Sequence, residues 1–259
     1  MNTPDQNLPG VNALLDDVER KHHARVLFAV ESGSRAWGFA SPDSDYDVRF
    51  VYVHQREWYL SVEDRRGVVE VNDGDLDVSG WELRKALRLL RKSNPSLLEW
   101  LNSPVVYRED KRFTSGLREL AGQCLDTSRC FQHYFHLARG QWQKYLQGDT
   151  VRLKKYLYVL RPVLACRWLE QDRGAVPVPF AELLAATLPE KSVRNAVDAL
   201  LVKKQSAGEA FAAAPDPVLH RFLETELQRL QPVAAGLIAS ADTDLEALDQ
   251  FFQTVALAA

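Results

Sequence analysis

The chain has 259 residues, of which 46% are hydrophobic, 26% charged and 10% aromatic, and its formal net charge is -3. This globular composition excludes disordered and fibrous proteins, and the slightly negative charge argues against a protein that coats a polyanion. Three cysteines without Cys-x-x-Cys spacing are expected to be reduced thiols, and no apolar run reaches the roughly 18–20 residues of a membrane span. The start MNTPDQNLPG lacks the basic and apolar regions of a signal peptide, so we expect a cytoplasmic protein with no membrane partner.

The N-terminal part of the chain alternates between helical and strand patterns. Apolar residues recur at helical spacing in some segments, whereas runs of β-branched and aromatic residues mark others. The strand expected furthest along this part is split by turn residues at Asn72–Gly74. The predicted elements are a helix over residues 11–23, strands over residues 25–31, 46–53 and 67–79, and helices over residues 81–92 and 95–101.

Beyond about residue 108 the strand signal stops, and the rest of the chain is predicted to be helical. Breaks such as Gly148–Asp149 and Pro189 divide this part. Helices are expected over residues 115–147, 151–171, 191–205, 216–238 and 243–257. The predicted fold class is therefore α+β, with a mixed module over residues 1–108 and an all-α module over residues 109–259.

The segment ESGSRAWGFASPDSDYDVRF holds a Gly-Ser pair, ten further residues and then Asp-x-Asp. Gly33 and Ser34 end a predicted strand and open a helix, so free backbone N–H groups there suit the phosphates of a nucleotide. Asp45 and Asp47 are two residues apart on a predicted strand, so their side chains are expected to leave the same face. Two such carboxylates, together with phosphates, are a usual protein environment for Mg²⁺.

A third acidic residue is expected on the neighbouring strand. Strand alternation places Asp75 and Asp77 on one face, while Leu76 and Val78 take the core face. Asp77 is preferred because it lies deeper in the strand, whereas Asp75 follows Gly74 and suits a turn. Asp75 stays open as the alternative.

These residues and their spacing resemble the Gly-Ser-x(n)-Asp-x-Asp signature of the DNA polymerase beta-like nucleotidyltransferase superfamily. Longer stretches are similar to the YcgL/RlaP group of predicted nucleotidyltransferases over most of residues 25–170. They are ESGSRAWGFASPDSDYDVRFVYV, DLDVSGWELRKALRLLRKSNPSLLEWLNSPVVY and LKKYLYVLRPVLACRW. The resemblance implies a nucleotidyltransferase fold over residues 1–108, a mixed sheet with flanking helices. It also implies that Gly33 and Ser34 form the phosphate loop and that Asp45, Asp47 and Asp77 are the catalytic metal ligands.

The reaction that this resemblance implies is transfer of a nucleoside monophosphate from an NTP to an acceptor hydroxyl, with release of pyrophosphate. Mg²⁺ is the expected cofactor, with Mn²⁺ as the alternative. An RNA end is the first acceptor expected, and a protein hydroxyl, which would make the chain a protein AMPylator, is the second. A toxin–antitoxin-type regulatory module is a further alternative, but its usual mark, loss of the acidic residues, is absent from this sequence.

Basic and aromatic residues around the motif are candidates for nucleotide binding. Arg35 and Arg49 flank the acidic residues, and Arg49 shares the strand parity of Asp47. In the segment RLKKYLYVLR, Lys154, Tyr158 and Arg161 are expected on one outer helix face, where Tyr158 would stack on a base and the cations would reach phosphates. A solvated basic face is the alternative for these last residues.

Two histidines in the helical part give weaker signals. His133 and His136 have helical spacing for a metal site, but no further ligand is near them in the sequence. Arg129 and His136 loosely resemble the R-x(4–6)-H motif of helical HEPN ribonucleases. A HEPN-like ribonuclease is therefore the least favoured alternative.

Overall fold

The computed structural model describes residues 10–207, 212–239 and 245–259. The chain divides into two compact units. Unit 1 comprises Met1–Ala36, Asp45–Leu125 and Ala241–Ala259, and unit 2 comprises Trp37–Ser44 and Asp126–Ser240. The chain thus leaves unit 1 after Ala36 and returns to it at Asp45.

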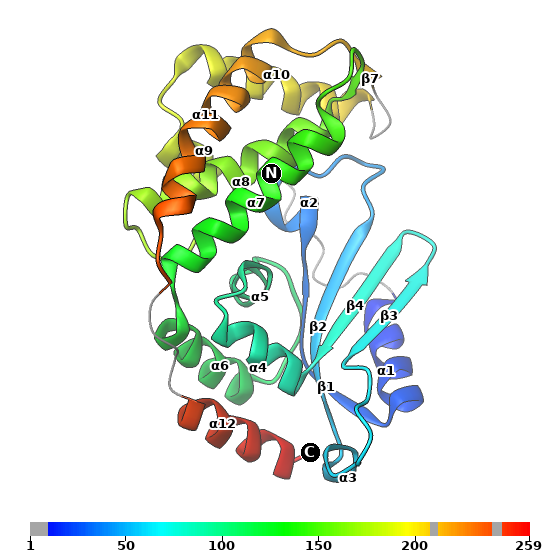
Figure 1. The fold of residues 1–259 in the computed structure, drawn as a ribbon. Helices are drawn as coiled ribbons and strands as arrows, with labels where there is room; N and C mark the ends of the chain where they lie inside the picture. The colour runs from blue at the N-terminus through cyan, green and yellow to red at the C-terminus, as the bar shows by residue number, and fades with distance from the viewer. Residues whose placement is uncertain (1–9, 208–211, 240–244) are drawn as a thin grey trace. The chain divides into compact units, whose positions relative to one another are not determined.

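Unit 1 is built on a five-stranded sheet with the order β3-β4-β2-β1-β5 (Figure 1). β2 and β4 are parallel, while β1 pairs antiparallel with β2 and β5, and β3 pairs antiparallel with β4. The predicted mixed sheet is therefore confirmed. The strands are β1 (Ala24–Glu31), β2 (Tyr46–His54), β3 (Val68–Asp73), β4 (Leu76–Glu82) and β5 (Val106–Glu109).

Helices cover both faces of this sheet (Figure 1). On one face, α1 (Val11–His22) packs its apolar side onto residues such as Phe50 and Val78. The other face is covered by α4 (Leu83–Arg91), α5 (Pro95–Leu101), α6 (Lys111–Cys124) and α12 (Leu245–Leu257). Two short helices complete the unit's elements, α2 (Gly33–Trp37), whose last residue is assigned to unit 2, and α3 (Arg56–Tyr59).

Side-chain caps fix where α4, α5 and α6 begin. The Glu82 carboxylate accepts hydrogen bonds from the N–H groups of Arg84 and Lys85 at the start of α4. Asn94 caps α5 and Asp110 caps α6 in the same way. Each cap satisfies backbone donors that a helix leaves free at its first turn, so these boundaries follow from local sequence.

Unit 2 is helical, with one short strand pair. Its helices are α7 (Thr127–Tyr145), α8 (Lys154–Glu170), α9 (Phe180–Thr187), α10 (Lys191–Ala207) and α11 (Pro217–Gly236), and its strands are β6 (Val151–Arg152) and β7 (Ala212–Ala213). α8 is buried along most of its length and continues through Pro162. In the parts of the chain that the structure describes, no helix combines the length and apolarity needed to cross a bilayer.

The predicted α+β class and the helical C-terminal region are confirmed, while several boundaries differ. The helix expected over residues 115–147 is two helices, because the Asp126 side chain caps α7 and starts a new helix there. β5, α3, α9 and the β6–β7 pair were not predicted, since each is short. The helix expected over residues 243–257 is observed from Leu245, and its first two predicted residues, like most of MNTPDQNLPG, lie outside the described residues.

The compact units also divide the chain differently from the expected boundary at residues 108 and 109. α6 follows that boundary in sequence but packs onto β1, and α12 packs onto α4 and α6. These apolar contacts keep residues 109–125 and the C-terminal helix in unit 1.

Candidate active site

Gly33 lies two residues after the end of β1, and its backbone lies against the Asp47 side chain. It has a φ of 59°, in the left-handed region that favours glycine. A Cβ atom at this position would collide with Oδ2 of Asp47. The Ser32 N–H also donates to the Asp47 carbonyl over 2.8 Å. The Gly-Ser turn and the Asp-x-Asp strand are therefore adjacent, as the motif predicts, and only glycine fits between them.

Asp47 and Asp77 lie side by side on parallel strands, at paired positions of β2 and β4. The Arg49 guanidinium bridges them, with Nη2 donating to Asp47 Oδ1 over 2.8 Å and to Asp77 Oδ2 over 2.9 Å. The Arg49 side chain is 18% exposed, against 28% for Asp47 and 50% for Asp77. The site therefore holds a cation between two carboxylates at a solvent-accessible edge of the sheet.

Asp45 lies outside the strand, contrary to the expectation that it shares a strand face with Asp47. β2 begins at Tyr46, whose N–H donates to the Asp75 carbonyl over 2.9 Å. The Asp45 carbonyl instead accepts a hydrogen bond of 3.2 Å from Nε of Arg35, whose guanidinium lies 3.6 Å from the centre of the Tyr46 ring. Asp45 is exposed in the loop before the strand, because its backbone bonds to a side chain and not to the sheet.

The structure separates the two candidates for the third acid. Asp77 is in β4, and its carboxylate shares Arg49 with Asp47. Asp75 is in the turn between β3 and β4, and its backbone carbonyl accepts the hydrogen bond from the Tyr46 N–H. Asp77, and not Asp75, is therefore brought together with Asp47.

Glu31, the last residue of β1, is a site residue that the sequence analysis missed. It is fully buried, and its Oε1 accepts a 2.9 Å hydrogen bond from the Asp47 N–H. Its Oε2 accepts a hydrogen bond from the Tyr107 hydroxyl, and its carbonyl accepts one of 2.6 Å from the Ser103 hydroxyl. A glutamate that ends an otherwise apolar strand (RVLFAVE) is the signal that could have found it, since a buried carboxylate needs partners.

Burial raises the pKa of Glu31 above its usual range, although the hydrogen bonds from Tyr107 and the Asp47 backbone oppose that shift. The negative charge of Asp47 raises the pKa further, and Arg35 lowers it. Burial and the hydrogen bond to Glu31 in turn raise the pKa of Tyr107. Glu31 therefore positions the Asp47 backbone from beneath the site and is shielded from solvent.

The predicted metal ligands are only partly assembled. Within the described residues, no group of three or more histidine, cysteine, aspartate or glutamate side chains is placed to hold a metal ion. Asp47 and Asp77 come together, while Asp45 stays in the preceding loop. The ligand set of three carboxylates remains a prediction.

The candidates from α8 lie in unit 2, and Arg161 does not occupy the expected outer face. Arg161 is 3% exposed, its guanidinium lies 4.6 Å from the centre of the Trp37 ring, and Nη2 donates to the Pro177 carbonyl over 3.4 Å. Tyr158 meets Trp37 edge-on at 5.9 Å, and Lys154 is half-buried at the start of the helix. Arg161 is buried because α8 has core contacts around most of its circumference.

The histidines His133 and His136, and Arg129, make ordinary local contacts in unit 2. Nδ1 of His136 lies 3.4 Å from the Arg139 guanidinium, and Nε of Arg129 forms a 3.3 Å ion pair with Asp126 at the start of α7. His133 packs edge-on against Tyr134. The described residues place no metal cluster around either histidine.

Residues 9–254 match the RlaP family, described as the "RNA repair pathway DNA polymerase beta family". The "Uncharacterized protein YcgL" of Bacillus subtilis (strain 168) is 45% identical over 226 residues, which cover 87% of each protein. The crystal structure of a nucleotidyltransferase-like protein from Exiguobacterium sibiricum 255-15 is 13% identical and covers 95% of this chain and 79% of that one, but its TM-score of 0.30 is too low to support an argument. Because the family match spans nearly the whole chain, this protein belongs to the RlaP family and is a nucleotidyltransferase of the DNA polymerase beta type.

Proposed function

We propose that this enzyme transfers a nucleoside monophosphate from an NTP to the hydroxyl of an RNA end and releases pyrophosphate. The observation that carries the proposal is the contact between the Gly33 backbone and the Asp47 carboxylate, beside Asp77 on the next strand. A phosphate loop and paired carboxylates at one edge of a sheet are what such a transfer requires.

The carboxylate pair fits a divalent cation. Asp47 and Asp77 already share one positive group, the Arg49 guanidinium, so the field between them favours a cation. Carboxylate oxygens are the ligands that Mg²⁺ and Mn²⁺ prefer. Asp47 and Asp77 would hold the metal, with Asp45 from the neighbouring loop, and a bound metal would stabilise charge on the phosphates and lower the pKa of the acceptor hydroxyl.

Residues of the chain itself position the triphosphate in this proposal. The close approach at Gly33 brings the Asp47 carboxylate against the backbone of the proposed phosphate loop, and Ser34 follows with a hydroxyl donor. Arg35 and Arg49 provide guanidinium groups within the same site. Glu31 keeps the Asp47 backbone fixed, so that the carboxylate meets the substrate without rearranging.

RNA is the acceptor that we propose, because the family is described as part of an RNA repair pathway. A protein hydroxyl is the alternative acceptor, and the same assay separates the two. Lys154 and Tyr158 remain proposed nucleotide contacts. The burial of Arg161 against Trp37 gives that residue a packing role and argues against a direct phosphate contact.

The experiment is label transfer from each α-labelled NTP, with Mg²⁺ or Mn²⁺, in the presence and absence of bulk RNA. We expect label on RNA with the wild-type enzyme and none with an Asp45→Asn/Asp47→Asn double variant. Loss of a catalytic carboxylate should slow transfer by about 10³-fold or more. The folded state of the variant is checked by circular dichroism and thermal melting.

Label on a protein band, absent in the double variant, would replace RNA by protein as the acceptor. Equal label with wild type and double variant would contradict the proposed site. RNA cleavage that survives the double variant but is lost in a His136→Ala variant would instead favour the HEPN-like alternative.

A further inference from the structure

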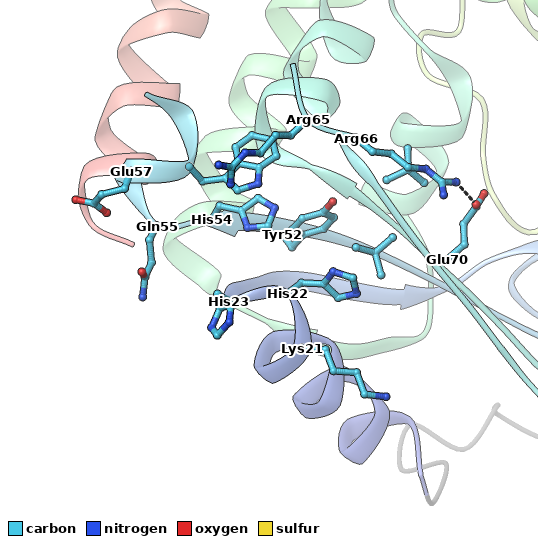
Figure 2. Close-up of a pocket in the computed structure, with 13 residues that line it drawn as sticks. Lys21, His22, His23, Tyr52, His54, Gln55, Glu57, Arg65, Arg66 and Glu70 are labelled. Carbon is cyan, nitrogen blue, oxygen red and sulfur yellow. Dashed lines mark hydrogen bonds and ion pairs between the residues drawn. The ribbon is translucent and has the colours of Figure 1, made fainter. Parts of the chain in front are cut away.

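A polar pocket lies in unit 1, at the end of the sheet away from Asp47 (Figure 2). Its volume is about 670 Å³. It is lined by the C-terminal end of α1, the last residues of β2 and the segment from α3 to the start of β3. Its volume falls within the range of small-molecule sites, about 300–1,000 Å³.

Positively charged and imidazole groups dominate this pocket. Lys21, His22 and His23 contribute from α1 and its end, and Arg65 and Arg66 come from the segment before β3. In Figure 2, Arg65 and Arg66 lie on one side of the end of β2, and His22 and His23 lie on the other. The concentration of donors with few acceptors favours an anion.

The two carboxylates that line the pocket already have cationic partners. Glu70 forms an ion pair with Arg66, and Glu57 lies 3.3 Å from Arg56, which is not a lining residue. Arg65 forms no ion pair with any residue that the structure describes, and its guanidinium lies 5.8 Å from the centre of the Trp58 ring. Arg65 is therefore available to a ligand.

A buried hydroxyl without a partner is the second, independent observation. Tyr52 is fully buried, lines the pocket, and its hydroxyl oxygen has no hydrogen-bond partner among the described residues. Figure 2 shows this hydroxyl pointing to the side of the pocket where Arg66 lies. Buried polar groups are nearly always paired, and this hydroxyl at a polar pocket is therefore a donor that a ligand can use.

The wall next to Tyr52 is aromatic and rigid. The His54 ring stacks on Trp58 with centroids 4.2 Å apart and an interplanar angle of 13°, and it meets Tyr52 edge-on at 5.3 Å. Burial lowers the pKa of His54, and the positive charge of Arg65 acts in the same direction. The pocket thus combines a fixed aromatic wall with a local excess of positive charge.

We propose that this pocket binds a phosphate-bearing small molecule of about mononucleotide size, with Arg65 and the Tyr52 hydroxyl donating hydrogen bonds to its phosphate. The site is distinct from the nucleotidyl-transfer site. Asp47 and His54 lie near opposite ends of β2, and a strand rises about 3.3 Å per residue, which puts them roughly 20 Å apart. Ligand binding in this pocket can therefore be tested separately from the proposed nucleotidyl transfer.

The test uses the histidines of the intact protein as NMR probes. The chain has six histidines, of which His22, His23 and His54 line the pocket, while His133, His136 and His220 belong to unit 2 and serve as internal references. Imidazole C–H resonances are followed during titrations with AMP, inorganic phosphate and adenosine. We expect AMP to shift the pocket histidines at the lowest concentration, inorganic phosphate to shift them more weakly, and adenosine to leave them unmoved.

Variants assign the effect to named groups. Arg65→Gln should weaken AMP binding by about tenfold, as expected for loss of a charge-assisted hydrogen bond, and Tyr52→Phe should weaken it by about fivefold. Tyr52→Phe should not lower the melting temperature of the unliganded protein, because the hydroxyl that it removes has no partner. Arg25→Gln is the matched control, since Arg25 is an exposed cation of β1 that does not line the pocket.

Several results would overturn the proposal. Resonances that stay unmoved by both phosphate ligands, or that move equally with adenosine and AMP, would exclude a phosphate site. An equal loss of AMP affinity in Arg65→Gln and Arg25→Gln would show that the effect comes from the overall charge of the protein and not from a contact with Arg65. A marked loss of unliganded stability in Tyr52→Phe would show that the hydroxyl already has an internal partner.

Discussion

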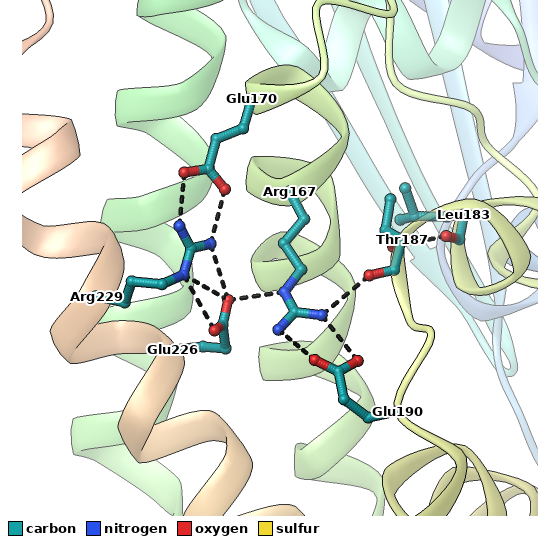
Figure 3. A network of polar contacts seen from close by, with 7 residues as sticks. All are labelled: Arg167, Glu170, Leu183, Thr187, Glu190, Glu226 and Arg229. Carbon is teal, nitrogen blue, oxygen red and sulfur yellow. Dashed lines mark hydrogen bonds and ion pairs between the residues drawn. The ribbon is translucent and has the colours of Figure 1, made fainter.

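Two arginine–carboxylate networks, one in each unit, use the same groups in different surroundings. In unit 1, Arg49 bridges Asp47 and Asp77 at an open edge of the sheet. In unit 2, Arg167 and Arg229 converge on Glu226, which is 6% exposed as a side chain (Figure 3). The first network leaves its carboxylates accessible to a ligand, whereas the second encloses its central carboxylate.

The unit 2 network is saturated by its own partners. Nε of Arg167 donates to Glu226 over 2.8 Å, and its terminal nitrogens donate to Glu190 over 2.9 and 3.1 Å. Arg229 contacts both carboxylate oxygens of Glu170 at 2.7 Å. The network joins α8, α11 and the residues between α9 and α10, so its role is to fix helices.

The contrast between the two networks shows that solvent exposure separates a structural ion pair from one that a ligand can reach. A buried carboxylate with two arginines holds the fold, because removing a partner leaves an uncompensated charge. A partly exposed pair of carboxylates that shares one arginine can still be reached by another cation from solvent. The same interaction is therefore structural in unit 2 and available for catalysis in unit 1.

The largest expected effect is on activity, from Asp77→Asn. Loss of this carboxylate should slow nucleotidyl transfer by about 10³-fold without unfolding the protein, because half of the open pair is removed. Asp75→Asn is the matched variant and should retain near-wild-type transfer, since its side chain lies in the turn. Rates come from label transfer under single-turnover conditions. A slow Asp75→Asn variant beside a near-wild-type Asp77→Asn variant would assign the third catalytic carboxylate to Asp75.

Glu226→Gln should show the opposite profile, with a large effect on stability. Removing the buried charge between Arg167 and Arg229 should cost about 3 kcal/mol in the free energy of unfolding, measured by urea denaturation. Glu224→Gln on the same helix is exposed and should change it by less than about 0.5 kcal/mol. Similar midpoints for both variants would contradict a structural role for the network.

A smaller effect is expected from Arg49→Gln, which tests whether Arg49 competes with a metal. Without the guanidinium between Asp47 and Asp77, Mn²⁺ should bind up to about tenfold more tightly, as judged by electron paramagnetic resonance of free Mn²⁺. Arg25→Gln removes an exposed cation from β1, outside the carboxylate pair, and should leave Mn²⁺ affinity unchanged. Weaker Mn²⁺ binding in Arg49→Gln would mean that the arginine supports the metal site.

The smallest expected effect is on the pH dependence of stability, which should differ between Glu31 in unit 1 and Glu226 in unit 2. Because burial raises the pKa of Glu31, its contribution is present below the ordinary glutamate range and is lost as pH rises through the raised value. Burial opposes the shift at Glu226, but hydrogen bonds from Arg167 and Arg229 lower its pKa, so its contribution is lost as pH falls through that value. The difference in unfolding free energy between wild type and Glu31→Gln, or Glu226→Gln, should therefore change in opposite directions with pH. Parallel changes would contradict the comparison.

Elements with local signals could be predicted from the amino-acid sequence alone. Asn94 marks a helix start through its own side chain, as predicted, and the Gly-Ser and Asp-x-Asp spacing predicted where the chain folds back at the site. The turn at Gly74 split the third predicted strand into β3 and β4, as expected. These features depend on neighbouring residues only, so pattern and composition suffice to find them.

Tertiary structure decided the features that depend on distant segments. Asp45 lies in the loop before β2, where its carbonyl accepts from Arg35, and Arg161 is buried in α8 with its guanidinium over the Trp37 ring. Glu31 meets Tyr107 across 76 positions of sequence, and the register of β4 against β2 pairs Asp77 with Asp47. Such pairings are set by strand register and core packing, whose free energies come from contacts between segments that no local pattern records.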